Sequence, residues 1–209
     1  MRPSSVRKRE AALVAAERQF LTTGYESVTM DSIAAESGVA KQTLYSYFGS
    51  KRALFLELVL ARTVHAADHV HGPPIVLDER SDPRAVLGEL LEGQLRTVLD
   101  PTLLALRRLV IAEANRSPEL AAILYEHGPE RAIRSIAQTL ERFIALGILR
   151  VANPELAATQ LNWLVMGEPI NRAMLLGPGS AEMSDDAIAA HVDRALDTFL
   201  AAADPSLRR

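Results

Sequence analysis

The sequence predicts an all-α protein. Ala and Leu dominate the composition, and aromatic residues make up only 5% of it. No stretch alternates apolar and polar residues with a period of two over the length of a strand. Glycine and proline fall between the helical segments, as in Gly72-Pro73-Pro74 and Gly177-Pro178-Gly179. With 48% hydrophobic residues among 209, the chain can bury a core without disulfides or metals.

The N-terminal quarter predicts three short helical segments followed by a long one. The first helix is expected over residues 4–22, with one apolar face formed by Val6, Leu13, Ala16 and Phe20. Two very short helices follow within residues 29–48. A long fourth helix is expected over residues 50–70, and it has no flexible linker before it. The domain boundary therefore falls at this helix, which divides the chain into residues 1–52 and 53–209.

The remaining sequence predicts further helices, several of which begin with the same signal. They are expected over residues 83–99, 101–115, 118–127, 129–146, 154–176 and 184–202. A capping side chain followed by proline at the first helical position marks four starts: Asp82-Pro83, Asp100-Pro101, Ser117-Pro118 and Asn153-Pro154. Asp100-Pro101 could instead kink one continuous helix.

Charge is distributed unevenly along the chain. Residues 1–52 hold eight Lys or Arg against five Asp or Glu, whereas the remainder holds 15 basic and 21 acidic residues. A basic module on an acidic body suits contact with phosphate at one end. The polar, basic start of the sequence resembles no secretory signal, and no apolar run approaches the roughly 20 residues of a membrane span. Together with the absence of cysteine, this predicts a soluble, cytoplasmic protein without membrane contact.

Residues 28–51 have the layout of a helix-turn-helix. Thr29 can cap a helix whose first turn holds Asp31, and Gly38 suits the left-handed conformation of a tight turn between helices. Ala34 is small enough for a second helix to cross closely. The apolar side of the two-helix unit is formed by Ile33, Val39, Leu44 and Phe48.

The second of these helices is short and carries polar side chains on its other face. These are Lys41, Gln42, Thr43, Ser46 and Tyr47. Gln42 can pair with the N6/N7 edge of adenine, and Lys41 can approach guanine or a phosphate. The pattern is typical of a recognition helix for double-stranded DNA. The alternative is a solvated polar helix in an all-α bundle.

The run TMDSIAAESGVAKQTLYSYFGSKRALF resembles the DNA-binding signature of the tetracycline-repressor (TetR) family. Its T-L-Y-x-Y/H-F-x-S/N-K element corresponds to residues 43–51 without departure at the fixed positions. The resemblance implies that Thr29 holds a phosphate and that Tyr45 and Lys51 clamp the DNA backbone. It places the recognition contacts on Lys41, Gln42, Thr43, Ser46 and Tyr47. Arg7 and Arg9 resemble residues that some members lay on phosphates or in the minor groove.

From Arg107 to about Pro169, the sequence resembles the ligand-binding domain of a multidrug-responsive branch of the same family. This resemblance implies that a small apolar ligand binds between helices of the domain. The mixture of aromatic, thioether and polar side chains favours a pocket lined by Leu103, Arg107, Tyr125, His127, Phe143, Trp163 and Met166. Taken singly, each of these residues fits ordinary core better than a ligand pocket.

The same resemblance implies that the chain pairs with itself through its last two long helices. Residues 185–200 carry one apolar stripe opposite an acidic face, and the preceding helix is apolar nearly all round. The expected dimer interface consists of Leu161, Leu164, Ile188, Val192, Leu196 and Phe199. Burial in the core of one chain is the alternative.

Other chemistries find little support. His65, His69 and His71 invite a metal reading, but a solvated or interfacial helix end suits them better. No phosphate-binding glycine loop or nucleophile elbow is present, so we expect no enzyme, no metal site and no cofactor.

These observations favour a homodimeric, sequence-specific DNA-binding regulator. It is expected to be a repressor that binds a palindromic operator and that a small apolar ligand releases. A DNA-binding regulator without a small-molecule effector is one alternative. A non-DNA-binding all-α ligand-binding protein is the other.

Overall fold

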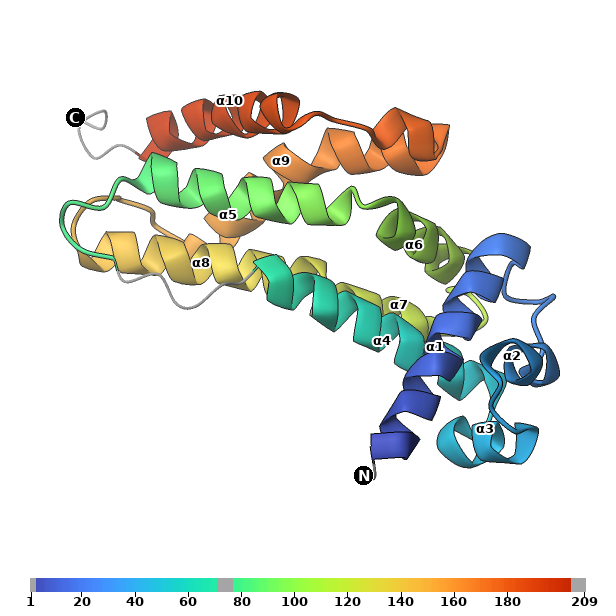
Figure 1. The fold of residues 1–209 in the computed structure, drawn as a ribbon. Helices are drawn as coiled ribbons and strands as arrows, with labels where there is room; N and C mark the ends of the chain where they lie inside the picture. Colours follow the sequence, from blue (N-terminus) through green and yellow to red (C-terminus); the bar gives the residue numbers. More distant parts are fainter. Residues whose placement is uncertain (1–2, 71–76, 204–209) are drawn as a thin grey trace. The chain divides into compact units, whose positions relative to one another are not determined.

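A computed structural model describes residues 3–70 and 77–203 of the chain. Within these ranges the structure is helical, and no strand is assigned (Figure 1). The predicted all-α fold class is confirmed. The helices are α1 (Pro3–Thr23), α2 (Met30–Ser37), α3 (Lys41–Phe48), α4 (Lys51–Val70), α5 (Pro83–Val98), α6 (Pro101–Glu113), α7 (Pro118–His127), α8 (Pro129–Ala145), α9 (Pro154–Leu176), the 3-10 turn η1 (Pro178–Ala181) and α10 (Asp185–Ala203).

Side-chain caps place several helix starts at the predicted residues. Asp82 accepts a hydrogen bond from the backbone N–H of Arg84, and Asn153 accepts one from that of Leu156. Asp100 accepts from the N–H groups of Thr102 and Leu103, at 2.9 and 3.0 Å. Because Asp100 caps α6 in this way, the Asp-Pro pair separates two helices and does not kink one.

The chain forms two compact units, and the boundary between them passes through α4, α6 and α7. The N-terminal unit comprises Met1–Thr63 and Ala105–Tyr125; the C-terminal unit comprises Val64–Leu104 and Glu126–Arg209. The last part of α6 and most of α7 thus pack with the N-terminal helices. Sequence patterns gave no sign of this, since the contact joins segments more than 40 residues apart. The functional division at residue 52 stays a prediction.

Aromatic packing forms the centre of the N-terminal unit. Phe20 of α1 and Phe55 of α4 are fully buried, with ring centroids 4.8 Å apart. Tyr25 completes the cluster at 5.5 Å from Phe20 and 5.0 Å from Phe55. Leu44 and Phe48 join the same core, and through them it fixes α3. Aromatic pairs at these distances add to the apolar burial that stabilises the unit.

Helices α5, α8, α9 and α10 enclose the core of the C-terminal unit and run side by side in Figure 1. The apolar stripe of α10 faces inward. Gly88 of α5 lies close to it, because a Cβ atom at this position would be 3.7 Å from Leu196. Arg84 extends from α5 to ion pairs with Asp193 and Asp197, and these contacts fix the register of α5 and α10.

A proline inside α9 leaves one backbone carbonyl without its helical donor, and a histidine of α10 supplies the missing bond. Pro169 has no N–H, so the carbonyl of Val165, four residues earlier, has no partner within the helix. The Nε2 atom of His191 lies 2.8 Å from that carbonyl oxygen. With the proton on Nε2, the imidazole donates the replacement bond and ties α10 to α9.

We expect His191→Ala to lower the free energy of unfolding by about 1–2 kcal/mol, because it leaves a buried carbonyl unpaired. In a Pro169→Ala background the loss should be smaller by about 1 kcal/mol, since the N–H of the new alanine can bond to Val165. Urea unfolding of the four proteins measures this coupling. The cavity left by His191→Ala cancels in the cycle, so strictly additive effects would show that the imidazole does not serve this carbonyl.

Candidate nucleic-acid interface

Thr29 begins the helix-turn-helix as a side-chain cap. Its Oγ1 accepts a hydrogen bond from the N–H of Ser32 at 3.1 Å, and the Ser32 hydroxyl accepts one from the N–H of Thr29 at 3.2 Å. The Thr29 hydroxyl acts here as an acceptor, so its own hydrogen remains available to an outside oxygen. A helix N-terminus with an exposed O–H donor suits a phosphate group.

The turn between α2 and α3 depends on one glycine. Gly38 has φ +66° and lies in the left-handed region, where other residues are strained. The next residue, Val39, is buried, and α3 begins two residues later at Lys41. The predicted location of the turn at Gly38 is thus the observed one.

Few residues of helix α3 pack against the rest of the chain. Of its eight residues, Leu44 and Phe48 are buried and anchor the helix to the N-terminal core. An isolated helix of this length is not stable in water. Four side chains are exposed and form one continuous face: Lys41, Gln42, Tyr45 and Ser46. That face is exposed to solvent and accessible to a partner outside the chain.

Thr43 and Tyr47 differ from these four, because both are half-buried. The Tyr47 ring packs edge-on against Phe48, with centroids 6.2 Å apart, and its hydroxyl lies 3.4 Å from the Ser5 hydroxyl. Tyr47 therefore supports α3 as well as presenting its phenol group. Removal of the whole ring would disturb packing, so Tyr47→Phe tests a DNA contact better than Tyr47→Ala.

The lysine that opens α3 is paired with an acid from α2. Lys41 Nζ donates to Asp31 at 2.8 Å, and both side chains are exposed. The hydrogen bond and the charge of Asp31 raise the pKa of the Lys41 ammonium. Sequence reasoning gave separate roles to these two residues, ten positions apart. Their pairing means that part of the charge of Lys41 is already compensated before DNA arrives.

We expect Asp31→Asn to increase affinity for random-sequence duplex DNA several-fold. The substitution removes a negative charge beside the phosphates and releases Lys41. The plot of log K against log salt concentration should become steeper by about 0.9, the value of one additional phosphate contact. Fluorescence anisotropy at several KCl concentrations measures the slope. Asp186→Asn, an exposed first-turn acid on α10, is the matched control. An unchanged slope for Asp31→Asn would show that the ion pair with Asp31 does not reduce the contribution of Lys41 to DNA binding.

Lys51 is directed towards the protein. Its Nζ donates to the carbonyl of Tyr25 at 2.9 Å and lies 3.3 Å from that of Glu26. The ammonium also sits over the Tyr25 ring, 4.3 Å from its centroid. Lys51 therefore ties the loop after α1 to the start of α4. Its predicted backbone contact with DNA stays a prediction that would use its remaining donor.

Arg9 is likewise engaged within the N-terminal unit. It forms an ion pair with Glu57 of α4, and its guanidinium lies 5.3 Å from the Phe48 ring centroid. A neighbouring network joins α1 to α2, where Gln19 donates to the carboxylate of Glu36 and accepts from the Ser32 hydroxyl. Sequence reasoning missed these contacts, because partners so distant in sequence leave no local pattern.

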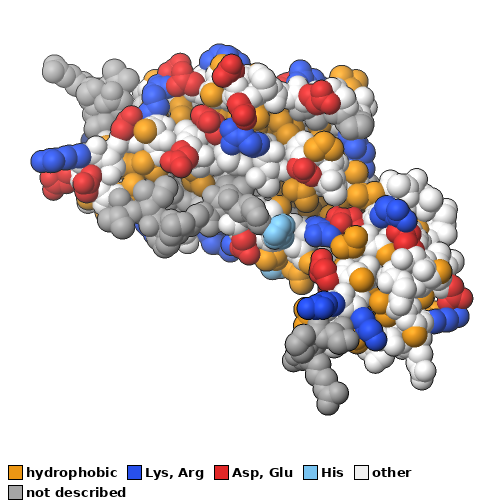
Figure 2. Space-filling model, in the orientation of Figure 1, with side chains coloured by type: hydrophobic (Ala, Val, Ile, Leu, Met, Phe, Trp, Pro, Cys, Tyr) orange, Lys and Arg blue, Asp and Glu red, His pale blue; other side chains and the backbone are white. Residues whose placement is uncertain are grey.

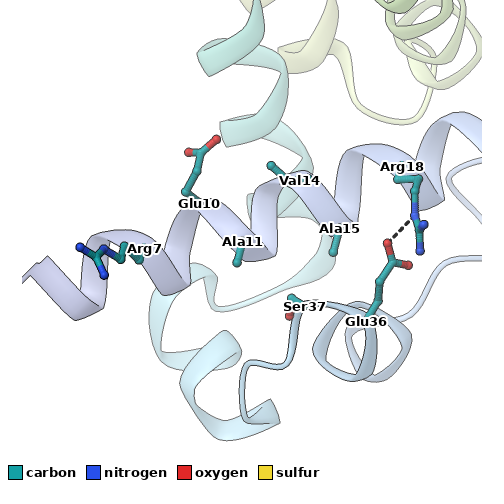
Figure 3. Close-up of a pocket in the computed structure, with 8 residues that line it drawn as sticks. All are labelled: Arg7, Glu10, Ala11, Val14, Ala15, Arg18, Glu36 and Ser37. Atoms are coloured by element: carbon teal, nitrogen blue, oxygen red, sulfur yellow. Dashed lines mark hydrogen bonds and ion pairs between the residues drawn. The ribbon is translucent and has the colours of Figure 1, made fainter.

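A hollow of ≈ 570 Å³ lies between α1 and the end of α2 (Figure 3). Small side chains, Ala11 and Ala15, form its floor with Ser37 opposite. The Arg18–Glu36 ion pair, 2.6 Å long, crosses its edge. This hollow was not anticipated from the sequence, and it belongs to the packing of α1 on α2.

Basic side chains do not form a continuous patch on the face drawn in Figure 2. Over the N-terminal unit, Lys and Arg stand beside Asp and Glu. The ion pairs described above join several basic and acidic side chains of this unit, and Arg62 adds a bidentate contact with Glu17 at 2.8 and 2.6 Å. The positive charge of residues 1–52 is therefore partly neutralised by ion pairs within the chain. The polar groups of α3, more than bulk charge, distinguish the candidate DNA surface.

The residues predicted to line a ligand pocket lie in different environments. Phe143 and Met166 are buried in the C-terminal core, at 0% and 5% exposure. Trp163 and Tyr125 are exposed, at 46% and 54%. Leu103, Arg107 and His127 are half-buried. Burial lowers the pKa of the Arg107 guanidinium. Trp163 is therefore only partly covered by the unit in whose core Met166 lies, and the pocket formed by these seven residues stays a prediction.

The predicted dimer stripe needs correction. Ile188, Val192, Leu196 and Phe199 pack inside the chain's own core, and so does Leu161 of α9. A stripe on an amphipathic helix must be buried, and here α5 and α9 of the same chain bury it. Among the six residues, Leu164 is the one left exposed, at 46%. It shares the outer surface of α9 with Leu156 and Trp163.

Comparison with known proteins identifies the class. Residues 12–58 match the family model described as bacterial regulatory proteins of the tetR family. Residues 85–203, more than half of the chain, match the model described as the C-terminal domain of AefR-like transcriptional repressors. The chain belongs to the TetR family of DNA-binding transcriptional regulators with an N-terminal helix-turn-helix. It is accordingly a regulator and not an enzyme.

Solved structures extend the similarity over nearly the whole chain. A TetR-family regulator from Mesorhizobium loti is 31% identical, with a TM-score of 0.85, and the match covers 98% of this chain and 99% of that one. The flavonoid-responsive regulator FrrA is 34% identical, with a TM-score of 0.80, and the match covers 95% and 98%. These similarities confirm the predicted arrangement of a helix-turn-helix followed by a helical C-terminal domain.

Curated relatives match over shorter stretches. The transcriptional activator FasR of Mycolicibacterium smegmatis is 38% identical over 86 residues, which are 41% of this chain and 38% of FasR. The regulator YhgD of Bacillus subtilis is 25% identical over 158 residues, which are 74% of this chain and 78% of YhgD. The chain thus spans less than half the length of FasR.

Two further features concern membranes and metal ions. No helix in residues 3–70 and 77–203 has the length and hydropathy to cross a bilayer. No cluster of three or more potential ligands for a metal ion occurs in the same ranges. His71 and the side chain of His69 lie outside what the structure describes.

Proposed function

We propose that this regulator is a homodimeric repressor that binds a palindromic operator and leaves it when a small, largely apolar ligand binds its C-terminal unit. The observation that carries the DNA part is the composition of α3. Two buried side chains hold this helix in place, and the remaining face offers Lys41, Gln42 and Ser46 to a major groove.

Dimerisation is supported by the outer surface of α9. Leu156, Trp163 and Leu164 are each about half exposed there, and Leu175 and Leu176 near the end of the helix are 74% and 72% exposed. Large apolar side chains gathered on one helix mark a contact surface. Two copies paired through this surface bury it, and the resulting twofold symmetry matches a palindromic site.

Repression and ligand response are supported by the relatives. The model that matches residues 85–203 describes repressors, and FrrA is named as flavonoid-responsive. FasR is named as an activator, but it matches less than half of this chain. Helix α4 is suited to carry the signal. It is held to α1 by the Arg62–Glu17 pair in the N-terminal unit and to α8 by Asp68–Arg131 in the C-terminal unit.

The test begins with an operator selected from random DNA and a titration of its affinity with and without a panel of neutral aromatic compounds. A coupling of about 1–3 kcal/mol would weaken operator binding between about 5-fold and 150-fold. A ligand that binds the protein and leaves operator affinity unchanged would contradict release. An operator affinity independent of salt would contradict the DNA contact itself.

A further inference from the structure

The core of the C-terminal unit contains a glutamine whose side-chain amide has no partner. Gln94 of α5 is 5% exposed, and neither its Oε1 nor its Nε2 atom has a hydrogen-bond partner among the described residues. Buried polar groups in folded proteins are nearly always paired, so an unpaired amide calls for an explanation. Its four hydrogen-bonding positions make it an unfavourable occupant of an apolar core.

The position of Gln94 on α5 directs it away from α10. Gly88, six residues earlier, faces Leu196 of α10. At about 100° per residue, Gln94 lies roughly a third of a turn from that side. It shares its side of the helix with Leu87 and Leu91, which are fully buried. Helices α8 and α9 also pack against α5 in this unit.

We propose that Gln94 is the polar anchor of the effector site, where its amide pairs with a hydroxyl or carbonyl group of a bound ligand. The site depends on the proposed ligand response and specifies its chemistry. An amide that stays unpaired until a ligand arrives makes the ligand-free unit less stable. The same amide discriminates strongly between a ligand that can hydrogen-bond and one that cannot, because it is otherwise left unpaired in the core.

The residues around the site favour an uncharged ligand. Among the described residues of the C-terminal unit, the buried polar side chains are Gln94 and Asn162 of α9, and neither ionises. The other buried residues of this core are apolar, including Phe143 and Met166. A carboxylate would lose its hydration among these apolar side chains, and neither amide supplies a countercharge. The ligand is therefore a mainly apolar, neutral molecule that carries at least one hydroxyl or carbonyl.

The first experiment needs no ligand. Gln94→Met keeps the unbranched shape and removes the amide, so the melting temperature of the full-length protein should rise by about 2–6 °C. Gln94→Leu is a second variant if methionine packs poorly. Leu95→Met, an apolar exchange at the adjacent buried position, is the control and should not raise it. An unchanged or lowered melting temperature in both Gln94 variants would overturn the proposal, because it would mean that the amide is already satisfied.

The second experiment uses three defined probes: naringenin and triclosan, which carry hydroxyl groups on apolar rings, and palmitate, which carries a carboxylate. Thermal shifts should show binding of at least one neutral probe to the wild type and none of palmitate. The affinity of that probe for Gln94→Met should be about tenfold weaker, with Leu95→Met close to wild type. Equal affinity of wild type and Gln94→Met, no binding by either neutral probe, or preference for palmitate would each overturn the assignment.

Two outcomes separate the proposed ligand response from the proposed role of Gln94. Binding of naringenin that leaves the operator complex intact would contradict ligand-responsive repression, whatever Gln94 does. Release of the operator by naringenin at equal concentrations in wild type and Gln94→Met would leave repression standing and remove Gln94 from the site.

Discussion

Gln42→Glu is expected to weaken operator binding by more than about 100-fold while leaving the melting temperature unchanged. Gln42 is fully on the exposed face of α3 and makes no packing contribution to the core. A carboxylate at this position faces the acceptor-rich edge of the base pairs and the phosphates, and like charges brought together in an interface cost several kcal/mol. Fluorescence anisotropy on the selected operator measures the loss.

Gln138→Glu supplies the matched control. Gln138 is an exposed residue of α8 in the C-terminal unit, so this variant has the same net charge as Gln42→Glu. It should bind the operator like the wild type. If both variants lose affinity equally, overall charge and not the α3 face determines binding, and the position of the interface would have to be abandoned.

Leu164→Glu is expected to convert the proposed dimer to a monomer and to reduce operator affinity by at least about 100-fold. The side chain is 46% exposed in the single chain, so the monomer should remain folded. A buried pair of carboxylates at a twofold interface is strongly unfavourable. Loss of the partner also removes the second recognition helix, and with it the gain from simultaneous binding of two half-sites. Light scattering and operator titration measure the two effects.

Ile111→Glu is the control for this substitution, since Ile111 is 58% exposed on α6 and lies in the other unit. It should remain dimeric. Phe199→Glu, by contrast, should unfold the C-terminal unit, because Phe199 is buried in the core. A Leu164→Glu protein that stays dimeric would place the interface on another surface.

Local patterns predicted the fold well, because the signals that start and stop these helices are themselves local. Thr29, Asp82 and Asn153 cap helices at the predicted positions, and Gly38 turns the chain where its φ requires glycine. The 3-10 turn η1 was missed, since it lies where glycine and proline indicated only a break.

Contacts between distant segments could not be predicted in the same way. Amphipathicity showed that α10 had to bury one stripe, yet it could not tell whether α5 of the same chain or a second subunit would cover it. The Lys41–Asp31 and Arg9–Glu57 pairs depend on how helices cross, and local patterns had assigned each cation a DNA contact instead. The unpaired amide of Gln94 is likewise visible only once its neighbours in space are known.

Selection of bound duplexes from a random DNA pool by the purified full-length protein tests whether paired α3 helices recognise an operator. Two inverted half-sites should be enriched, with centres about one helical turn (roughly 34–36 Å) or a multiple of it apart. Gln42→Ala should lose preference at the same base pair in both half-sites. Enrichment of a single asymmetric site, or of no sequence, would contradict recognition by paired α3 helices.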